Sequence, residues 1–205
     1  MSAEQPGPGE EWNPGEVTDA RVASSLILLR DGDGGPEVLL VQRNPEQRFM
    51  GGAWVFPGGA LDAGDADERA TAVRELTEEA GIDLPPDAEL ARYSRWITPA
   101  QVKVRFDTHF FVARAPEGAE AAVDGNECVD SRWLSPAAAL EAGRSEELLL
   151  VFPTIKHLEQ LAEHANVEEA MQAARDRKVQ PVEPKVLIDG GVANVVLPGE
   201  PGYDD

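Results

Sequence analysis

The chain of 205 residues has little of three things: cysteine, basic side chains and long apolar runs. Cys128 is its single cysteine, which excludes an internal disulfide and any zinc site built from several cysteines. It has 18 basic and 38 acidic side chains, and the resulting formal charge of −20 repels nucleic-acid backbones and anionic membranes. No apolar run reaches the roughly 18 to 20 residues that span a bilayer. We therefore expect neither a nucleic-acid partner nor a membrane partner.

The remaining composition is that of a globular protein, with 42% hydrophobic and 27% charged residues. The first residues, MSAEQPGPGEEWNPGE, are acidic and rich in proline and glycine, which predicts a mobile tail and not a signal peptide. We expect a disordered acidic tail at 1–18, a domain at 19–165 and a helix and hairpin extension at 166–205. The chain ends in Gly-Tyr-Asp-Asp, not in a Ser-Lys-Leu-type import signal, so the expected location is cytoplasmic.

Apolar runs between turn residues predict a strand-rich first half and a helix-rich second half. Strands are expected at 22–29, 37–42, 54–56, 91–98, 105–113 and 128–134. Helices are expected at 65–80, from Ser135-Pro136 onward, at 152–164 and at 167–177, before a hairpin over 185–197 that turns at Asp189-Gly190-Gly191. This order indicates a mixed α/β fold with a sheet sandwiched between helices.

The most informative stretch is RELTEEAGI at residues 74–82. At 100° per residue, Glu75, Glu78 and Glu79 share one side of a helix, and Glu68 lies two turns back on that side. The opposite side, which we expect to dock on the sheet, carries Ala70, Val73, Leu76, Thr77 and Ala80.

Clustered carboxylates repel one another, and each like-charged pair costs about 0.2–0.5 kcal/mol. A bound divalent cation would neutralise the cluster formed by Glu75, Glu78 and Glu79, and oxygen-only ligands favour Mg²⁺ or Mn²⁺ over zinc. The alternative is an ordinary charged, solvated helix face.

Phe56-Pro57-Gly58-Gly59 followed by RELTEEAGI resembles the signature of the Nudix hydrolase superfamily. That signature is a glycine, a spacer and Arg-Glu-apolar-x-Glu-Glu-x-Gly-apolar on a loop, a helix and a second loop. The second half matches at every defined position. In the first half the signature's glycine falls on Ala60 and its glutamate on Ala66, which leaves Asp65, Asp67 or Glu68 as the replacement acid.

The resemblance implies a Nudix-type α/β/α sandwich with a mixed sheet, extended by C-terminal helices and a hairpin. It also implies hydrolysis of a diphosphate linked to another group, with Mg²⁺ or Mn²⁺ as cofactor. Glu75, Glu78 and Glu79 match the metal-ligand positions, and the carbonyl of Gly59 is an additional candidate ligand. Arg74 matches an arginine that orients one of these glutamates.

The general base stays open between a helix glutamate and Glu127, which precedes a predicted strand and is otherwise an ordinary loop acid. His109 is expected to be structural, and His157 and His164 are too far apart for a pair of metal ligands. Cys128 is expected to be a small apolar filler.

A second resemblance concerns the substrate. LLVQRN at 39–44, then Arg48, Gly52 and FPGG at 56–59, is similar to the motif of coenzyme A diphosphatases, with departures at Val41 and Asn44. The segments 95–99 and 105–111 resemble the peroxisomal coenzyme A-type Nudix proteins. The resemblance makes coenzyme A or acyl-coenzyme A the first-choice substrate, and an anionic substrate needs local positive charge. The candidate cations are Arg43, Arg48, Arg95 and Arg105, each of which could instead form a surface ion pair.

Rival interpretations keep the fold and change the ligand or the activity. ADP-ribose, NADH and diphosphoinositol-like compounds are rival substrates, and a non-catalytic Nudix domain that only binds a ligand is the rival from another class. The intact Glu75, Glu78 and Glu79 set disfavours the pure binder. The expected partner is a small-molecule nucleotide diphosphate, and the hairpin is a candidate contact for a homodimer.

Overall fold

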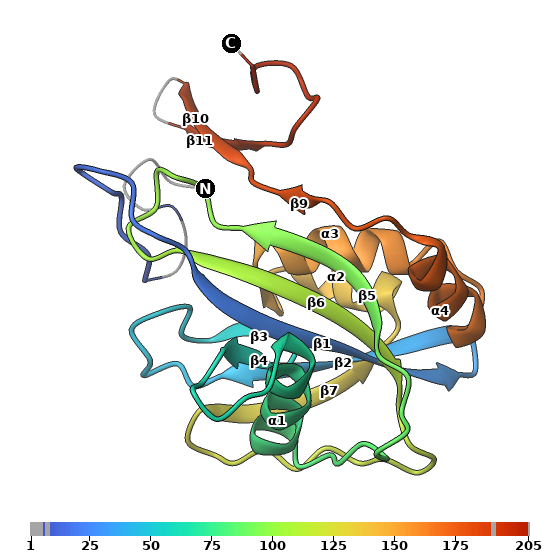
Figure 1. Ribbon diagram of the computed structural model, residues 1–205. Coiled ribbons are helices and arrows are strands. Elements are labelled where there is room, and N and C mark those ends of the chain that lie inside the picture. Colours follow the sequence, from blue (N-terminus) through green and yellow to red (C-terminus); the bar gives the residue numbers. More distant parts are fainter. Residues whose placement is uncertain (1–5, 7–8, 190–191, 205) are drawn as a thin grey trace.

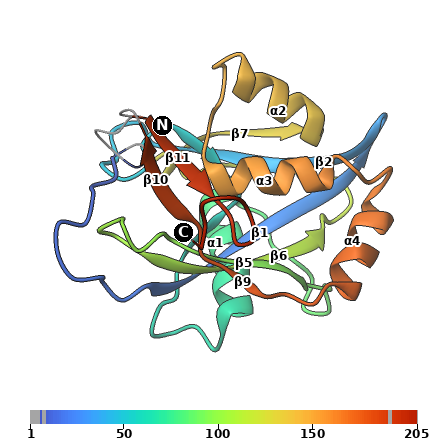
Figure 2. The same cartoon turned by 90° about the horizontal axis from the view of Figure 1, so that it is seen from above.

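The computed structural model describes residue 6, residues 9–189 and residues 192–204. A twisted sheet forms the middle layer of the molecule (Figure 1). Helix α1 (Glu68–Ala80) covers one face, whereas α2 (Pro136–Arg144), α3 (Phe152–Leu161) and α4 (Val167–Asp176) cover the other (Figure 2). The predicted α/β/α sandwich is therefore confirmed.

Within the described residues the sheet has nine strands, ordered β8-β3-β2-β1-β6-β5-β9, with β4 paired to β1 and β7 paired to β2. The strands are β1 (Arg21–Gly32), β2 (Gly35–Arg43), β3 (Ala53–Val55), β4 (Gly58–Ala60), β5 (Ala91–Ile97), β6 (Phe106–Arg114), β7 (Cys128–Leu134), β8 (Leu149–Leu150) and β9 (Pro181–Val182). The pairs β1–β6, β3–β8 and β5–β9 are parallel and the others antiparallel, so the sheet is mixed as predicted.

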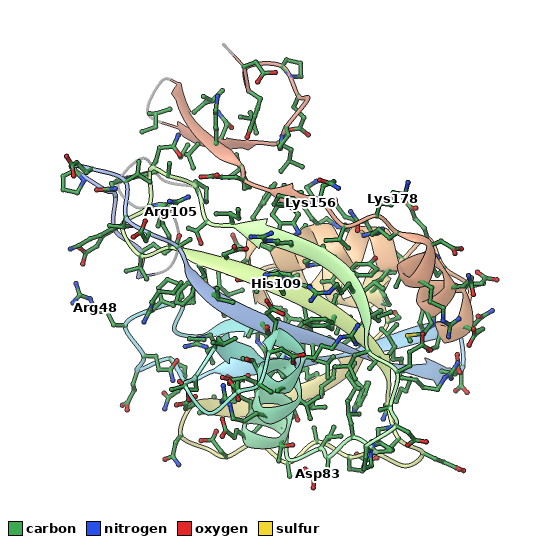
Figure 3. The ribbon with its side chains drawn as sticks, viewed as in Figure 1. Arg48, Asp83, Arg105, His109, Lys156 and Lys178 are labelled. Carbon is green, nitrogen blue, oxygen red and sulfur yellow. The ribbon has the colours of Figure 1, made fainter. Side chains whose placement is uncertain are left out.

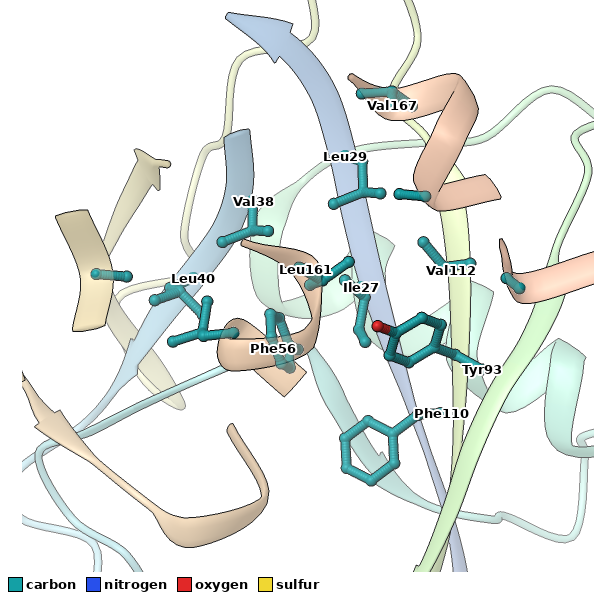
Figure 4. Packing of buried hydrophobic residues seen from close by; sticks show 14 of the residues in the cluster. Ile27, Leu29, Val38, Leu40, Phe56, Tyr93, Phe110, Val112, Leu161 and Val167 are labelled. Atoms are coloured by element: carbon teal, nitrogen blue, oxygen red, sulfur yellow. The ribbon is translucent and has the colours of Figure 1, made fainter. Parts of the chain in front are cut away.

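Strand β1 runs through the centre of this sheet and separates two apolar cores. Leu26 and Leu28 face the core under α1, while Ile27 and Leu29 face the core under α3 and α4. Successive strand residues point to opposite faces, so a strand covered on both sides is apolar at every position. Figure 4 shows the second core around Ile27 and Leu29.

The predicted elements of the first 180 residues are present, with shifted ends. Shifts of three residues occur at the end of β1, at the end of α3 and at the start of α1, which begins at Glu68 and not at residue 65. Asp67 has an extended backbone, and its side chain accepts a hydrogen bond of 2.9 Å from the N–H of Ala70, which makes it the N-cap. Gly81 ends the helix in the left-handed conformation, with φ of 65°. The strands β4, β8 and β9 have two or three residues each and leave no periodic pattern.

The docked face of α1 differs from the predicted one. Leu76 and Ala80 are buried as expected, but Thr77 is exposed, so its predicted place on the sheet side was wrong. Ala70 and Val73 are only half-buried, whereas Ala72 is fully buried. The helix is rotated toward β4, where two glycines leave room for the larger glutamate side chains.

The C-terminal hairpin pairs β10 (Lys185–Asp189) with β11 (Val192–Val196) antiparallel, which confirms the prediction. Gly190 and Gly191 at its predicted turn lie outside the described residues. The hairpin lies beside the N-terminal segment in both ribbon views.

The N-terminal segment contacts the loop between β5 and β6. The Lys103 ammonium donates to the Glu11 carboxylate at 2.7 Å, and Trp12 forms an antiparallel bridge with Val102. The predicted tail falls partly on residues 1–5 and 7–8, which lie outside the described residues. Helix α4 shares the core of the sheet, and the division at residues 18 and 165 stays a prediction.

None of the helices in the described chain has the length and apolar character to cross a membrane.

Candidate active site

The loop that joins β3 to β4 brings Phe56-Pro57-Gly58-Gly59 against α1. The N–H of Gly58 donates to Glu79 Oε2 at 2.9 Å. A Cβ on Gly58 would lie 2.5 Å from the carbonyl oxygen of Ser24, and a Cβ on Gly59 would lie 2.2 Å from Glu75 Oε1. Both contacts are too short for a real Cβ, so the two glycines allow β4 to lie directly beside the helix carboxylates.

Arg74 holds two of the three predicted ligands together. Its Nη1 donates to Glu75 Oε1 at 2.9 Å and to Glu78 Oε2 at 2.7 Å. Its Nη2 also donates to the carbonyl of Ala60 at 3.2 Å, which ties the arginine to the end of β4. This is the geometry that an orienting arginine requires.

Asp65 anchors this arginine from the other side. Arg74 Nε and Nη2 donate to the two oxygens of Asp65 at 3.1 and 3.0 Å, a bidentate contact. Of the other candidates for the missing acid, Asp67 caps α1 and Glu68 pairs with Arg92 at 3.3 Å. Asp65 is thus the acid that contacts Arg74, and these bonds hold its carboxyl pKa well below the usual range.

The two inner glutamates carry charge that their surroundings do not neutralise. Glu79 is 2% exposed and Glu75 is 7% exposed. Burial raises the pKa of Glu75, and it raises the pKa of Glu79 to about 7, although Arg43 opposes the change at Glu79. Desolvation disfavours a carboxylate unless a cation compensates for the lost water.

The carboxylates around Arg74 outnumber its single guanidinium. Asp65, Glu75 and Glu78 all contact this one arginine, so the cluster carries excess negative charge that a divalent cation would reduce.

As they stand, these side chains do not converge on one point. Among the residues that the structure describes, no three acidic, histidine or cysteine side chains are arranged to hold an ion. The chemistry of the donors nevertheless fits a hard divalent cation, because all are oxygens, two are buried and their charge is uncompensated.

A cavity of about 770 Å³ opens over this cluster. Where the cavity adjoins α1 and β4, its lining residues include Arg43, Gly58, Gly59, Ala60, Asp62, Arg74, Glu75, Glu78 and Glu79, and Glu127 lines it as well. The rest of the wall is mainly apolar and includes Phe49, Met50, Trp96, Ile97, Val102, Phe106, Phe110, Leu150, Val151, Phe152, Ile155, Val186 and Val195. One continuous space therefore joins an acidic end to an apolar end.

Of the four predicted substrate-binding arginines, Arg43 is the one that lines the described cavity. It donates to Gln47 Oε1 at 2.6 Å. Arg48 is not among the residues that line the cavity, and its side chain lies at the edge of the molecule (Figure 3). This exposed side chain pairs with Glu11. The sequence could not show which of Arg43 and Arg48 lines the cavity, because both belong to one loop motif.

The other two arginines form structural ion pairs. Arg95 makes a bidentate contact with Asp107 at 2.8 and 2.6 Å. Arg105 is buried and donates to Glu183 Oε1 at 2.6 Å and to two backbone carbonyls. Neither belongs to the described lining of the cavity, so the structure does not bring these residues together with the carboxylates.

Arg21 and Glu10 are charged lining residues that the sequence analysis missed. Arg21, the first residue of β1, lines the cavity and stacks its guanidinium over the ring of Phe106 at 4.8 Å from the centroid. Glu10 lines it from the N-terminal segment, and burial raises the pKa of its carboxyl to about 7. Neither residue belongs to a motif, so no sequence signal marked them.

The histidines and the cysteine lie where packing explains them. His157 is fully buried between aromatic rings, and its Nε2 lies 2.6 Å from Ser94 Oγ. Cys128 is buried beside Glu79, and burial together with that carboxylate raises the pKa of its thiol. A thiol that stays protonated is a poor nucleophile.

Comparison with known proteins gives a consistent result. The model of the NUDIX domain family matches residues 19–152. The human acyl-coenzyme A diphosphatase NUDT19 is 25% identical over an alignment that covers 82% of this chain and 72% of that protein.

Two solved structures resemble this fold. The crystal structure of a NUDIX hydrolase from Alicyclobacillus acidocaldarius is 31% identical and has a TM-score of 0.68, over 76% of this chain and 96% of the other. The NUDIX domain of Shewanella oneidensis NrtR, solved with ADP ribose, has a TM-score of 0.56 at 22% identity, over 75% of this chain and 93% of the other, and supports the fold alone.

Proposed function

Since the chain belongs to the NUDIX domain family, we propose that this hydrolase cleaves the diphosphate bond of a nucleotide-linked substrate, with coenzyme A or acyl-coenzyme A as the first choice. One observation carries the proposal. A single cavity of about 770 Å³ joins the carboxylates of α1 to a long apolar wall. Cavities of this size hold an organic ligand of several tens of atoms.

Nudix hydrolases generally use a divalent metal, and here we propose Mg²⁺ or Mn²⁺ held by Glu75, Glu78, Glu79 and the carbonyl of Gly59. When bound, such an ion neutralises diphosphate charge, lowers the pKa of a bound water and stabilises the leaving oxygen.

The protein's own residues hold the parts of the site in place. Arg74 fixes the carboxylates of Glu75 and Glu78, and the Gly58 N–H fixes that of Glu79. Arg43 supplies positive charge in the cavity of a protein whose net charge is −20, where an anionic substrate needs it.

A proton must leave the attacking water, and two groups are candidates to accept it. Glu79 lines the cavity and its Oε2 is held by the N–H of Gly58, which makes it the candidate on the helix. Glu127 also lines the cavity. Glu79 and Glu127 are both candidates for the general base.

Coenzyme A is favoured over rival diphosphates by two supports. The residues LLVQRN, Arg48, Gly52 and FPGG are similar to a coenzyme A diphosphatase motif, and the human relative is named for acyl-coenzyme A. Arg43 is the motif arginine that reaches the cavity. Roles in substrate binding for Arg48, Arg95 and Arg105 stay predictions, as do the cytoplasmic location and the homodimer.

The test is a substrate panel with Mg²⁺ or Mn²⁺, with products identified by mass spectrometry. Coenzyme A, an acyl-coenzyme A, ADP-ribose and NADH are compared at equal concentration. We expect coenzyme A or its acyl ester to give the highest kcat/KM, and Glu79→Gln to lower kcat by at least two orders of magnitude. The matched control is Glu159→Gln, which removes an exposed carboxylate of α3 and should leave kcat within twofold.

Each other outcome contradicts a defined part of the proposal. Faster cleavage of ADP-ribose or NADH would overturn the coenzyme A assignment but not the hydrolase. Tight binding of a panel member without turnover of any would favour the non-catalytic ligand-binding module.

A further inference from the structure

Most of the apolar residues that line the cavity belong to the family match at residues 19–152, but the C-terminal hairpin outside that match also contributes to the wall. Pro184 and Val186 come from the start of the C-terminal hairpin, and Val195 comes from its second strand. Val186 is 7% exposed, so it faces the body of the protein and not solvent. Val186 and Val195 are paired across the hairpin and form one wall.

The hairpin is fixed to the body at its base. The buried Arg105 donates to Glu183 Oε1 at 2.6 Å, to the Thr98 carbonyl at 2.9 Å and to the Thr18 carbonyl at 2.8 Å. This one guanidinium joins the N-terminal segment, the loop after β5 and the segment before β10. Gln101 Nε2 further donates to the Val186 carbonyl at 3.4 Å.

The wall next to the hairpin comes from the sheet and the loop after β5. Trp96 and Ile97 at the end of β5 and Val102 in that loop line the same cavity. Thr98 and Glu10 also line the cavity, but most of its lining side chains are apolar, and burying a strongly hydrated group among apolar side chains is unfavourable. A flexible apolar chain fits, because its transfer from water onto such walls is favourable.

We propose that the β10–β11 hairpin is a specificity element that binds the apolar acyl chain of the substrate and selects for its length. The placement of the reacting diphosphate at the acidic end rests on the proposed function. Because the same cavity is lined by the carboxylates of α1 and by the hairpin, the pantetheine arm and its thioester-linked acyl chain extend from the diphosphate toward Val186 and Val195. Arg105 is a positioning residue for this wall.

Binding is tested first, without turnover. Calorimetry in EDTA compares butyl phosphate with dodecyl phosphate, which share one head group and differ in chain length. In the wild type we expect the dodecyl ligand to bind at least tenfold more tightly. Val186→Trp, which fills the apolar end, should reduce that preference at least tenfold. Ile188→Trp is the matched control, since Ile188 is on the same strand, 59% exposed and not among the lining residues.

Turnover is tested second, as the ratio of kcat/KM for dodecanoyl-coenzyme A to that for coenzyme A. Val186→Trp should lower this ratio at least tenfold, Val186→Ala should shift the optimum to longer chains, and Ile188→Trp should leave it within twofold. Melting curves confirm that each variant folds, and Val186→Ala serves if the tryptophan variant does not.

The outcomes separate the two proposals. Chain-length preference in binding that Val186→Trp removes, without cleavage of any coenzyme A compound, upholds the hairpin and overturns the proposed substrate. Cleavage of coenzyme A with no chain-length preference, or with a preference that Val186→Trp and Val186→Ala leave unchanged, overturns the hairpin's role.

Discussion

At the scale of single residues, the site depends on how one arginine is held. Arg74 contacts three carboxylates, and the contact with Asp65 is the bidentate one. The sequence left Asp65, Asp67 and Glu68 as equal candidates for the acid that the motif lacks. The structure distinguishes them because a cap and a surface ion pair occupy the other two.

We predict that Asp65→Asn lowers kcat about tenfold or more. The substitution removes the charge that anchors Arg74, so Glu75 and Glu78 lose their common orientation. Steady-state kinetics at saturating metal measures the effect. The control is Asp67→Asn, which makes the same chemical change two residues away. Asp67 is the N-cap of α1, a position where asparagine is as good as aspartate. Equal losses in the two variants would contradict the anchoring role of Asp65.

At the scale of elements, α1 shows what its sequence could and could not specify. Its C-terminal end and its three clustered glutamates follow from local patterns, whereas its start was predicted three residues too early. Its rotation on the sheet does not, because Glu75 and Glu79 are buried only where Gly58 and Gly59 of a distant segment leave space. Helical periodicity placed those glutamates on the side opposite the docked face.

Metal binding by this element has a measurable consequence. We predict that millimolar Mg²⁺ or Mn²⁺ raises the Tm of the wild type by several degrees, because an ion that binds only the folded cluster stabilises it by mass action. The double variant Glu75→Gln/Glu79→Gln should lose this rise. It should also be more stable than the wild type without metal, since burial raises the pKa of both carboxyls and so opposes their ionised forms.

The matched control removes two carboxylates of the same type elsewhere. Glu141→Gln/Glu159→Gln changes exposed residues of α2 and α3 that pair with Arg144 and Lys156. Its Tm should respond to metal as the wild type does. A metal response that survives in Glu75→Gln/Glu79→Gln, measured by differential scanning calorimetry, would rule out a metal site on α1.

At the scale of the whole molecule, the sheet order and the cavity depend on contacts that no local pattern encodes. Arg105 stands in a motif that suggested substrate binding, but its partner Glu183 is 78 residues away and fixes the C-terminal hairpin. Arg48 and Arg43 lie on one loop, yet only the folded chain determines which of them faces the cavity. The sequence therefore predicted the catalytic helix better than the binding surface around it.

A buried titratable side chain also affects how the stability of the whole molecule depends on pH. His157 is fully buried among aromatic rings, and this burial lowers its pKa to about 3. The usual value of an unfolded histidine is about 6.5. Above that pH both states are neutral and the residue has no effect. Below it the unfolded chain binds a proton that the folded protein cannot, so stability falls by about 1.4 kcal/mol per pH unit until the folded pKa is reached.

We predict that His157 lowers the unfolding free energy of the wild type by about 2 to 3 kcal/mol between pH 7 and pH 4.5. His157→Gln cannot titrate but keeps a polar partner for Ser94 Oγ. The variant should be less stable than the wild type at pH 7, because the ring packing is lost. At pH 4.5 the difference in unfolding free energy between the two proteins should be smaller by about 2 to 3 kcal/mol. Urea unfolding at the two pH values measures both differences. Leu158→Ala changes a neighbouring core residue without changing a titratable group, so its difference in unfolding free energy from the wild type should be the same at both pH values. If the difference for His157→Gln is also the same at both pH values, His157 does not cause the loss of stability in acid.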